Sequence, residues 1–416
     1  MEIISDFHIH SRYAMACSPS ITIKGLAHEA QEKGIKLLST GDFTHPSWFS
    51  EIKENLSEYQ NGIYSLKGEK SGTMFVLGVE ICTIFNKDGK TRKIHNCVLA
   101  PNIAVAEQIN DVLSKRGPLT SDGRPVFNMH ASELVEILME IDKSITVFPA
   151  HIWTPYFGAL GSMSGFDSIK DAYEDQAKNI HALETGLSSD PKMNWRLSSL
   201  DKITLLSNSD AHSLHKLGRE ANVLEISEDK LSYGEIADCI IKKDPKRIKL
   251  TVEFYPEEGK YHFDGHRKCN ISLSPQEAEK YNNICPVCRK NLTIGVLHRV
   301  NDLADRPEGY TPKNAIPYLH TVPLREVIAY IMKKNDSSPA VDEALRKLVS
   351  SFGSEFNVLL NEDISKLEGV DKELGIAIER IRKERVHLIP GYDGVFGVID
   401  IMDKIKENKH GTQMTL

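Results

Sequence analysis

Short apolar runs alternate with amphipathic stretches over the first 230 residues, and this alternation limits the fold more than any other feature of the chain. A mainly parallel sheet is expected from alternating strands and helices, either open or closed into a barrel. The expected strands are 2–9, 35–42, 73–81, 93–101, 144–152, 180–187 and 203–212. The expected helices are 22–33, 102–115, 131–141, 166–178 and 191–200, with N-caps at Thr22, Ser132 and Asp190. A turn at 86–90 joins two antiparallel strands.

The rest of the chain divides into shorter segments. A final helix and a connecting strand fill 228–255, a Cys/His cluster fills 262–290, and 323–385 is predominantly helical. At 416 residues the chain is too long for one small core. We therefore expect an α/β domain at 1–255, a small metal-binding unit at 256–300, and a helical region with a flexible tail at 301–416.

Composition narrows the class of protein. No run of 18 or more apolar residues is present, and the opening MEIISDFHIH does not resemble a secretory signal. The seven cysteines favour reduced thiols over a disulfide framework, so we expect a cytoplasmic, nucleoid-associated protein. The net charge of −7 does not favour nucleic-acid binding. However, the acidic excess lies before residue 241, where bound cations would offset it.

Ionisable side chains recur at the ends of the expected strands. Residues at i and i+2 on a strand face the same side, and the carboxyl ends of parallel barrel strands meet on one face. Burying so many ionisable groups together without cations would cost several kcal/mol each. Imidazoles and carboxylates without thiolates suit zinc, manganese or iron. The candidate ligands are His8, His10, Asp42, Glu80, His95, His151, Asp210 and His212.

In their order and motifs, these residues resemble the PHP (polymerase and histidinol phosphatase) superfamily. The matching elements are the opening HxH, the TGD at 40–42, the PAH at 149–151 and the SDAH at 209–212. This resemblance implies a distorted (β/α)7 barrel with a trinuclear metal centre. Two departures weaken the third metal position: SRYAMACS after the HxH lacks the usual aspartate, and Asp42 stands where the superfamily has histidine.

The resemblance also suggests how the ligands are shared between two or three divalent cations (zinc, manganese or magnesium). His8, His10, Glu80 and Asp210 would hold the first ion, and Glu80 would bridge to a second at His95 and His151. Asp42 and His212 would complete a third. Metal-activated hydroxide would attack phosphorus. Glu80, Asp210 and Arg219 are the expected catalytic residues, with Arg219 on a phosphate oxygen or, equally, in a surface salt bridge.

A second metal site is indicated by two knuckles, His266-x2-Cys269 and Cys285-x2-Cys288. Their separation is typical of a zinc ribbon with one cysteine replaced by histidine. Four protein ligands leave no open position, so this zinc would be structural. His262 is an alternative fourth ligand. Basic residues flank the knuckles and would face phosphates or simply solvent.

Two expected helices meet at Leu367-Glu368-Gly369-Val370 and resemble a degenerate helix-hairpin-helix, a motif whose turn amides grip a DNA backbone. Plain helical packing explains this segment equally well. The last four residues, Gln413, Met414, Thr415 and Leu416, resemble the C-terminal peptide by which repair proteins bind a sliding clamp.

Over nearly its full length the chain resembles the endonuclease Q family. The resemblance rests on DFHIHSRY, STGDFTHPSW, PAHIWTPY, LSNSDAHS with LGRE, and CPVC followed by GSEFNVLL. It implies a DNA-repair endonuclease that nicks 5′ of deaminated bases (uracil, hypoxanthine, xanthine) and abasic sites. The nick would leave a 3′-hydroxyl and a 5′-phosphate, with the target nucleotide flipped into a pocket.

Aromatic residues that follow ligand-bearing strand ends are candidates for that pocket, or else cap the barrel core: Trp48, Trp153, Tyr156 and Phe157. Two other functions remain open. A small-molecule phosphatase of the histidinol-phosphate kind shares the barrel but leaves the ribbon without a task. A non-catalytic DNA-binding scaffold would be expected to lack metal ligands.

Overall fold

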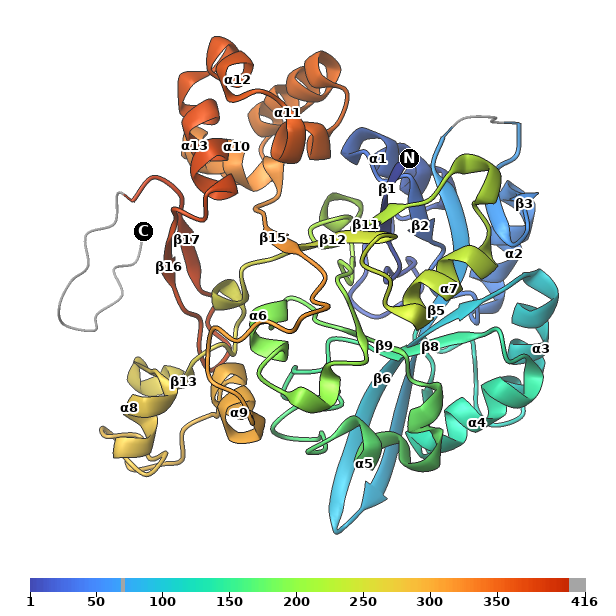
Figure 1. The fold of residues 1–416 in the computed structure, drawn as a ribbon, viewed down its shortest axis with the longest axis horizontal. Helices are drawn as coiled ribbons and strands as arrows, with labels where there is room; N and C mark the ends of the chain where they lie inside the picture. The colour runs from blue at the N-terminus through green and yellow to red at the C-terminus, as the bar shows by residue number, and fades with distance from the viewer. Residues whose placement is uncertain (69–71, 404–416) are drawn as a thin grey trace.

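The computed structural model describes residues 1–68 and 72–403 (Figure 1). The larger part of the molecule is an α/β unit around a large mixed sheet, with helices on its outside. Apolar residues from strands and helices fill two large buried clusters in this unit. The strands that surround the candidate site are β1 (Glu2–Asp6), β2 (Leu37–Ser39), β5 (Met74–Lys87), β6 (Lys90–Ala100), β8 (Thr146–Pro149), β9 (Ala182–Glu184) and β10 (Thr204–Leu206).

These strands close into a ring. β1, β2 and β5 pair in parallel, and β5, β6 and β8 pair antiparallel. The Ile152 amide, just beyond β8, donates to the Glu184 carbonyl of β9 at 3.1 Å, and β9 pairs in parallel with β10. A parallel bridge between Ile9 and Ala211 connects the chain beyond β10 to the chain beyond β1. The expected distorted (β/α)7 barrel is therefore confirmed.

Most of the expected helices form, although several are shorter. Helices α1 and α6 begin at the expected caps: Thr22 accepts from the Gly25 amide and Asp190 from the Met193 amide. The expected cap at Ser132 is wrong, because α4 starts one residue before it and the Ser132 hydroxyl bonds to Glu174. The barrel helices are α1 (Ile23–Lys33), α2 (Pro46–Asn55), α3 (Ile103–Ser114), α4 (Ala131–Ile141), α5 (Ile169–Tyr173), α6 (Pro191–Asn194) and α7 (Tyr233–Lys242).

The sheet contains more antiparallel pairing than the alternation of strands and helices suggests. β11 (Ala221–Glu225) inserts antiparallel between β1 and β12 (Ile248–Glu253), and β5 and β6 form the expected hairpin around the 86–90 turn. The other strands that sequence patterns missed are β3 (Leu56–Gln60), β4 (Ile63–Leu66), β7 (Val126–Phe127) and β15 (Tyr318–His320). β15 pairs with β12, so the chain returns to the barrel sheet after residue 300.

A small unit lies below the helical bundle on the left of Figure 1. It contains the hairpin β13 (Asp264–His266) and β14 (Ile271–Leu273) and the helix α8 (Pro275–Lys280), followed by α9 (Val296–Leu303). Its buried apolar core is only Ala278, Cys285 and Leu292. So small a core does not stabilise a fold by itself, which is a reason to expect metal at the Cys/His cluster.

The C-terminal bundle packs on a core of its own. A hairpin descends from the bundle toward the small unit (Figure 1). Among the described residues, no helix is long and apolar enough to cross a membrane. The elements are α10 (Leu324–Met332), α11 (Pro339–Phe352), a π-helical turn (Asn357–Asn361), α12 (Ile364–Val370), α13 (Lys372–Arg382), β16 (His387–Ile389) and β17 (Val398–Asp400).

Candidate metal centre

The barrel brings the predicted strand-end residues to one face. His8 and His10 follow β1, Asp42 follows β2, and Glu80 lies within β5. His95 lies in β6, His151 follows β8, and Asp210 and His212 follow β10. Most of these side chains are buried, whereas those of Asp210 and His212 keep 26% and 33% of their surface exposed. The face is therefore accessible to a ligand from the Asp210 side.

Two imidazoles and two carboxylates form the first group of converging donors. Ligand atoms of His8, His10, Glu80 and Asp210 all lie within 4.8 Å of one another. The Nε2 atom of His10 lies 3.1 Å from Asp210 Oδ1 and 3.2 Å from Glu80 Oε2. The Nε2 atom of His8 lies 3.6 Å from each of the same two oxygens. This cluster has the donor types and the spacing that a divalent cation requires.

A second group shares Glu80 with the first. Glu80 Oε1 lies 2.7 Å from His95 Nδ1 and 3.1 Å from His151 Nε2. The two imidazole nitrogens are themselves 3.3 Å apart. Because Glu80 turns Oε2 to one group and Oε1 to the other, its carboxylate is placed to bridge two cations.

The far nitrogens of the first-group histidines are held by carboxylates. His8 Nδ1 lies 2.9 Å from Glu184 Oε2, and His10 Nδ1 lies 3.1 Å from Asp42 Oδ1. Donation from Nδ1–H leaves the Nε2 lone pair pointing into the site. His8 Nε2, His10 Nε2 and Asp210 Oδ1 are buried and have no hydrogen-bond partner among the described residues. Buried donors left unpaired and aimed at one another fit a cation that would accept their lone pairs.

The carboxylates of the site ionise readily, as a cation requires. Burial lowers the pKa of His10, but Asp42, Asp210 and Glu80 raise it well above its usual value, so a cation would displace a proton from this imidazole on binding. Burial raises the pKa of Glu80, but the nearby His95 and His8 imidazoles outweigh it and hold the pKa well below its usual range. Burial likewise opposes the ionisation of Asp210, yet His8 and His10 lower its pKa. Burial lowers the pKa of His95 to about 4, which keeps that imidazole neutral as a metal ligand must be.

Three of these residues have an uncommon backbone conformation. Asp42, His151 and Asp210 have φ of 46°, 30° and 47°, in the left-handed region. Non-glycine residues there carry a conformational cost and cluster at functional sites. The turns that follow β2, β8 and β10 are thus held in strained geometry where their side chains enter the site.

Two residues near the site were not found by sequence reasoning. Glu184 ends β9, binds His8, and also accepts from the His151 amide and from Asn208. The sequence did contain a signal for Glu184, because it lies in the expected strand 180–187, just as the other acidic candidates lie in or next to expected strands. Arg124 lies in the loop before β7, and its Nη1 is 3.1 Å from Glu80 Oε2. It follows no expected strand, so no sequence pattern indicated it.

The residues proposed for a third ion do not converge in the same way. Both oxygens of Asp42 are bonded within the protein, to His10 Nδ1 and to the Ser11 amide. His212 Nδ1 lies 2.8 Å from the Asp210 carbonyl. No donor group found among residues 1–68 and 72–403 includes Asp42 or His212. The third ion stays a prediction from the sequence.

Arg219 is bound to the backbone. Its Nε donates to the Ser209 carbonyl at 2.8 Å and its Nη2 to the Asp210 carbonyl at 3.3 Å. The guanidinium therefore fixes the turn that presents Asp210. A phosphate contact by Arg219 stays a prediction.

Two of the four aromatic candidates are unsuited to contact a base. Trp48 and Trp153 are fully buried, and their indole N–H groups bond to the Thr40 and Gly41 carbonyls and to Asn194 Oδ1. Their expected pocket role is corrected: they cap the barrel core, the alternative that sequence left open. Tyr156 is 47% exposed, and the Phe157 ring lies 4.5 Å from the His95 ring. Both remain candidates.

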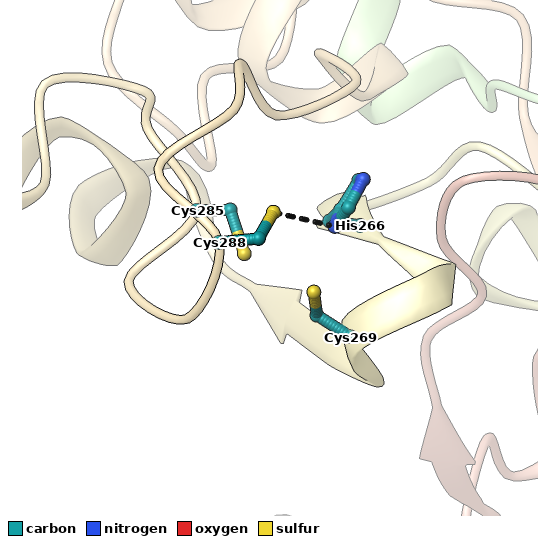
Figure 2. A group of neighbouring side chains, drawn as sticks. All are labelled: His266, Cys269, Cys285 and Cys288. Carbon is teal, nitrogen blue, oxygen red and sulfur yellow. Dashed lines mark hydrogen bonds between the residues drawn. The ribbon is translucent and has the colours of Figure 1, made fainter.

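The small unit gathers the predicted zinc ligands. Donor atoms of His266, Cys269, Cys285 and Cys288 lie within 4.8 Å of one another (Figure 2). His266 Nδ1 lies 3.4 Å from Cys288 Sγ, while the alternative ligand His262 is buried outside this group. Burial raises the pKa of Cys285, but hydrogen bonds from the amides of the knuckle outweigh burial and lower the pKa overall. The lowered pKa favours the thiolate that binds metal.

The helical pair at 364–382 was expected to present backbone amides to a DNA backbone. At the start of its second helix, the described amides are not free. Asp371 ends α12 and caps α13, and its carboxylate accepts from the Glu373 and Leu374 amides. These amides are already paired inside the protein. The DNA-contacting role of the hairpin stays a prediction.

Comparison with known sequences places the chain among proteins with the same C-terminal unit. The family model described as the MJ0043 C-terminal domain matches residues 323–385. The chain is 35% identical to the protein MJ0043 of Methanocaldococcus jannaschii over 240 residues, covering 56% of this chain and 30% of that protein. It is also 28% identical to the protein YqxK of Bacillus subtilis, over 96% of this chain and 99% of that protein.

Two solved structures match the whole fold. One is the crystal structure of the lesion-specific endonuclease PfuEndoQ from Pyrococcus furiosus, with a TM-score of 0.86 and 30% identity over the full length of both chains. The other is endonuclease Q in complex with a 27-mer duplex substrate with an abasic lesion at the active site. Its TM-score is 0.85 with 31% identity, covering 98% of this chain and 99% of that one. The chain therefore belongs to the endonuclease Q family of nucleases.

Proposed function

We propose that this chain is a metal-dependent endonuclease that nicks damaged DNA on the 5′ side of deaminated bases (uracil, hypoxanthine, xanthine) and abasic sites. The observation that carries the proposal is the paired donor geometry around Glu80, whose two oxygens serve two groups of imidazoles and carboxylates. The related structure with an abasic duplex at its active site supports DNA as the substrate.

In this proposal the residues divide into ligands and positioning groups. His8, His10, Glu80 and Asp210 would hold one cation, and Glu80 with His95 and His151 a second. Two cations, when bound, supply Lewis acidity and an activated water for in-line hydrolysis of a phosphodiester. Glu184 and Asp42 fix the imidazole rings, as carboxylates next to metal-binding histidines commonly do.

The nucleotide would enter from the exposed side of the site. Asp210 and His212 are its partly exposed members, and Tyr156 and Phe157 follow the His151 turn. We infer that these two aromatics face an extruded nucleotide, because aromatic rings stack on any base. The ribbon would hold a structural zinc, since its four donors leave no open position.

Binding to a sliding clamp is a separate proposal. It depends on Gln413, Met414, Thr415 and Leu416, which lie outside the residues that the structure describes. Deleting residues 411–416 tests it by clamp affinity. Unchanged affinity would end the idea.

The test of the main proposal uses 5′-labelled duplexes that carry one uracil, hypoxanthine or abasic site, beside an undamaged duplex, with Mg²⁺ or Mn²⁺. Asp210→Ala removes a ligand, and Asp111→Ala removes an exposed carboxylate on α3 as the matched control. We expect a single nick immediately 5′ of the lesion with the wild type and the control, and none with Asp210→Ala.

Hydrolysis of p-nitrophenyl phosphate is measured in parallel. If every duplex stays intact while the phosphomonoester is turned over, the barrel is a phosphatase and the endonuclease proposal is wrong. Tight binding of damaged DNA without any nick, at full metal occupancy, would instead favour a binding scaffold.

A further inference from the structure

A guanidinium group lies at the centre of the barrel site without an assigned task. Arg124 Nη1 is 3.1 Å from Glu80 Oε2, the oxygen that faces the first donor group. The Arg124 side chain is 20% exposed, so it lies inside the site yet remains accessible. Its guanidinium is charged at every working pH, as that of arginine is in proteins generally.

The loop that carries Arg124 is held against the site by both of its neighbours. The Asp122 carboxylate accepts from the Arg124 and Met15 amides, and the Gly123 amide donates to the Tyr13 carbonyl. A Cβ atom at Gly123 would overlap the Asp42 carboxylate, so only glycine fits there. Immediately afterwards β7 pairs with β5, the strand that carries Glu80.

Two other arginines near the site are bonded to protein groups. Arg219 bonds to the Ser209 and Asp210 carbonyls, and Arg12 forms an ion pair with Glu51. Arg124, by contrast, contacts a candidate metal ligand directly. The position of Arg124 suits a side chain that contacts the substrate next to the cations.

The charges of the site leave a role for this arginine. Four acids surround the two donor groups, and all but Asp210 are buried: Glu80, Asp210, Asp42 and Glu184. Two divalent cations would neutralise four carboxylates, and the negative charge of an entering phosphodiester would then face Arg124. In the described part of the chain, Asp42 and His212, the residues expected at a third cation, belong to no group of converging donors, and Asp42 is fully bonded. The remaining barrel group, His8 with Cys97 and Glu184, shares His8 with the first group.

We propose that Arg124 is a catalytic residue that binds a non-bridging oxygen of the scissile phosphate, supplying the positive charge that a third cation would otherwise supply. The inference rests on the proposed function for its substrate. Arginine suits this task because its planar fork pairs with phosphate oxygens in a bidentate way. A preorganised donor of this kind binds the phosphate group and also stabilises the negative charge that develops on its oxygens in the transition state.

The experiment compares the metal-loaded full chain with Arg124→Ala and Arg124→Lys. Arg116→Ala is the matched control, because Arg116 precedes the same loop and forms an ion pair with Glu133 on the surface. Three quantities are measured: the single-turnover nick rate on an abasic duplex, the number of bound divalent ions by mass spectrometry, and the affinity for inorganic phosphate by calorimetry.

With Arg124→Ala we expect the nick rate to fall about 10²–10³-fold, with partial recovery on adding guanidinium ion. Phosphate binding should weaken at least about tenfold, as expected when a charged contact is lost. The metal count should stay at two ions for the barrel and one for the ribbon. Arg124→Lys should be intermediate, and Arg116→Ala should match the wild type.

An unchanged nick rate or unchanged phosphate affinity in Arg124→Ala would overturn the inference. Loss of metal from that variant would show that Arg124 only neutralises Glu80, and a third barrel ion in the wild type would also overturn it. If the wild type nicks no duplex, the proposed function fails. The phosphate affinities of the same variants then decide whether Arg124 contacts a phosphate group.

Discussion

Replacing Lys33 by methionine should loosen the attachment of the C-terminal bundle to the barrel. Lys33 is the last residue of α1, and its Nζ lies 2.8 Å from Glu355 Oε2. Glu355 lies in the segment that connects α11 to the π-helical turn. Both side chains are only 6% exposed. The other Glu355 oxygen accepts from the Leu324 amide at the start of α10. One buried ion pair thus connects the barrel with two elements of the bundle.

The magnitude follows from burial. Removing one member of a buried pair leaves the other charged in an apolar surrounding, which costs about 3–5 kcal/mol. Changing Lys33→Met together with Glu355→Gln removes both charges and keeps an acceptor for the Leu324 amide. The free energy of unfolding of the double variant should therefore lie within about 1–2 kcal/mol of the wild-type value and well above that of Lys33→Met alone.

Urea unfolding measures these free energies with two probes. All three tryptophans, Trp48, Trp153 and Trp195, lie in the barrel, so their fluorescence reports on that unit. Far-ultraviolet circular dichroism reports on the helices of both units. If the two transitions separate in Lys33→Met but coincide in the wild type, the bundle has lost its coupling to the barrel.

The control is the exposed pair between Lys53 and Glu107, which are 45% and 49% exposed at 3.0 Å. Lys53→Met should change stability by less than about 1 kcal/mol. If Lys33→Met costs no more than Lys53→Met, or if the double variant costs as much as the two single variants together, the reasoning from burial is wrong.

Four further outcomes are expected. Glu184→Gln should weaken metal affinity about 10–100-fold by releasing His8, measured by chelator competition; unchanged affinity would contradict the orienting role. Cys288→Ala should remove one zinc per chain, and retention of all zinc would exclude the ribbon site. Burial lowers the pKa of His320, but Asp190 and Glu384 outweigh it and raise the pKa to about 9. Protonated His320 therefore stabilises the folded state fully below about pH 6.5, and this stabilisation is lost as the pH rises through about 9. It amounts to about 3 kcal/mol, and His320→Gln should abolish that part of the pH dependence of unfolding; parallel profiles would refute it. Trp153→Ala should destabilise the barrel by about 3–5 kcal/mol, whereas Tyr156→Ala should leave stability within about 0.5 kcal/mol and slow nicking; the reverse pattern would return the pocket role to Trp153.

Local sequence patterns were sufficient for the parts of the protein that depend on neighbouring residues. The alternation of β and α units predicted a mainly parallel sheet, open or closed, and the resemblance to the PHP superfamily implied the barrel. The helix caps at Thr22 and Asp190 depend on residues three positions apart. Knuckle spacing likewise predicted the ribbon ligands, because a turn between two closely spaced ligands is a local structure. Strand periodicity placed ionisable groups such as His8 and His10 on one face.

Only the tertiary structure decided which distant groups meet. Glu184 lies 176 residues from His8, and Arg124 lies 44 residues from Glu80, and no local pattern encodes either pairing. The burial of Trp48 and Trp153 could not be read from their position after a strand either, since it depends on what packs above them. The sequence by itself determined the kinds of donor and the strands that carry them. The resemblance to the PHP superfamily implied their division into two groups around Glu80. No local pattern encodes that division, because only the closed ring of the folded chain brings β1, β5, β6, β8 and β10 to a common end.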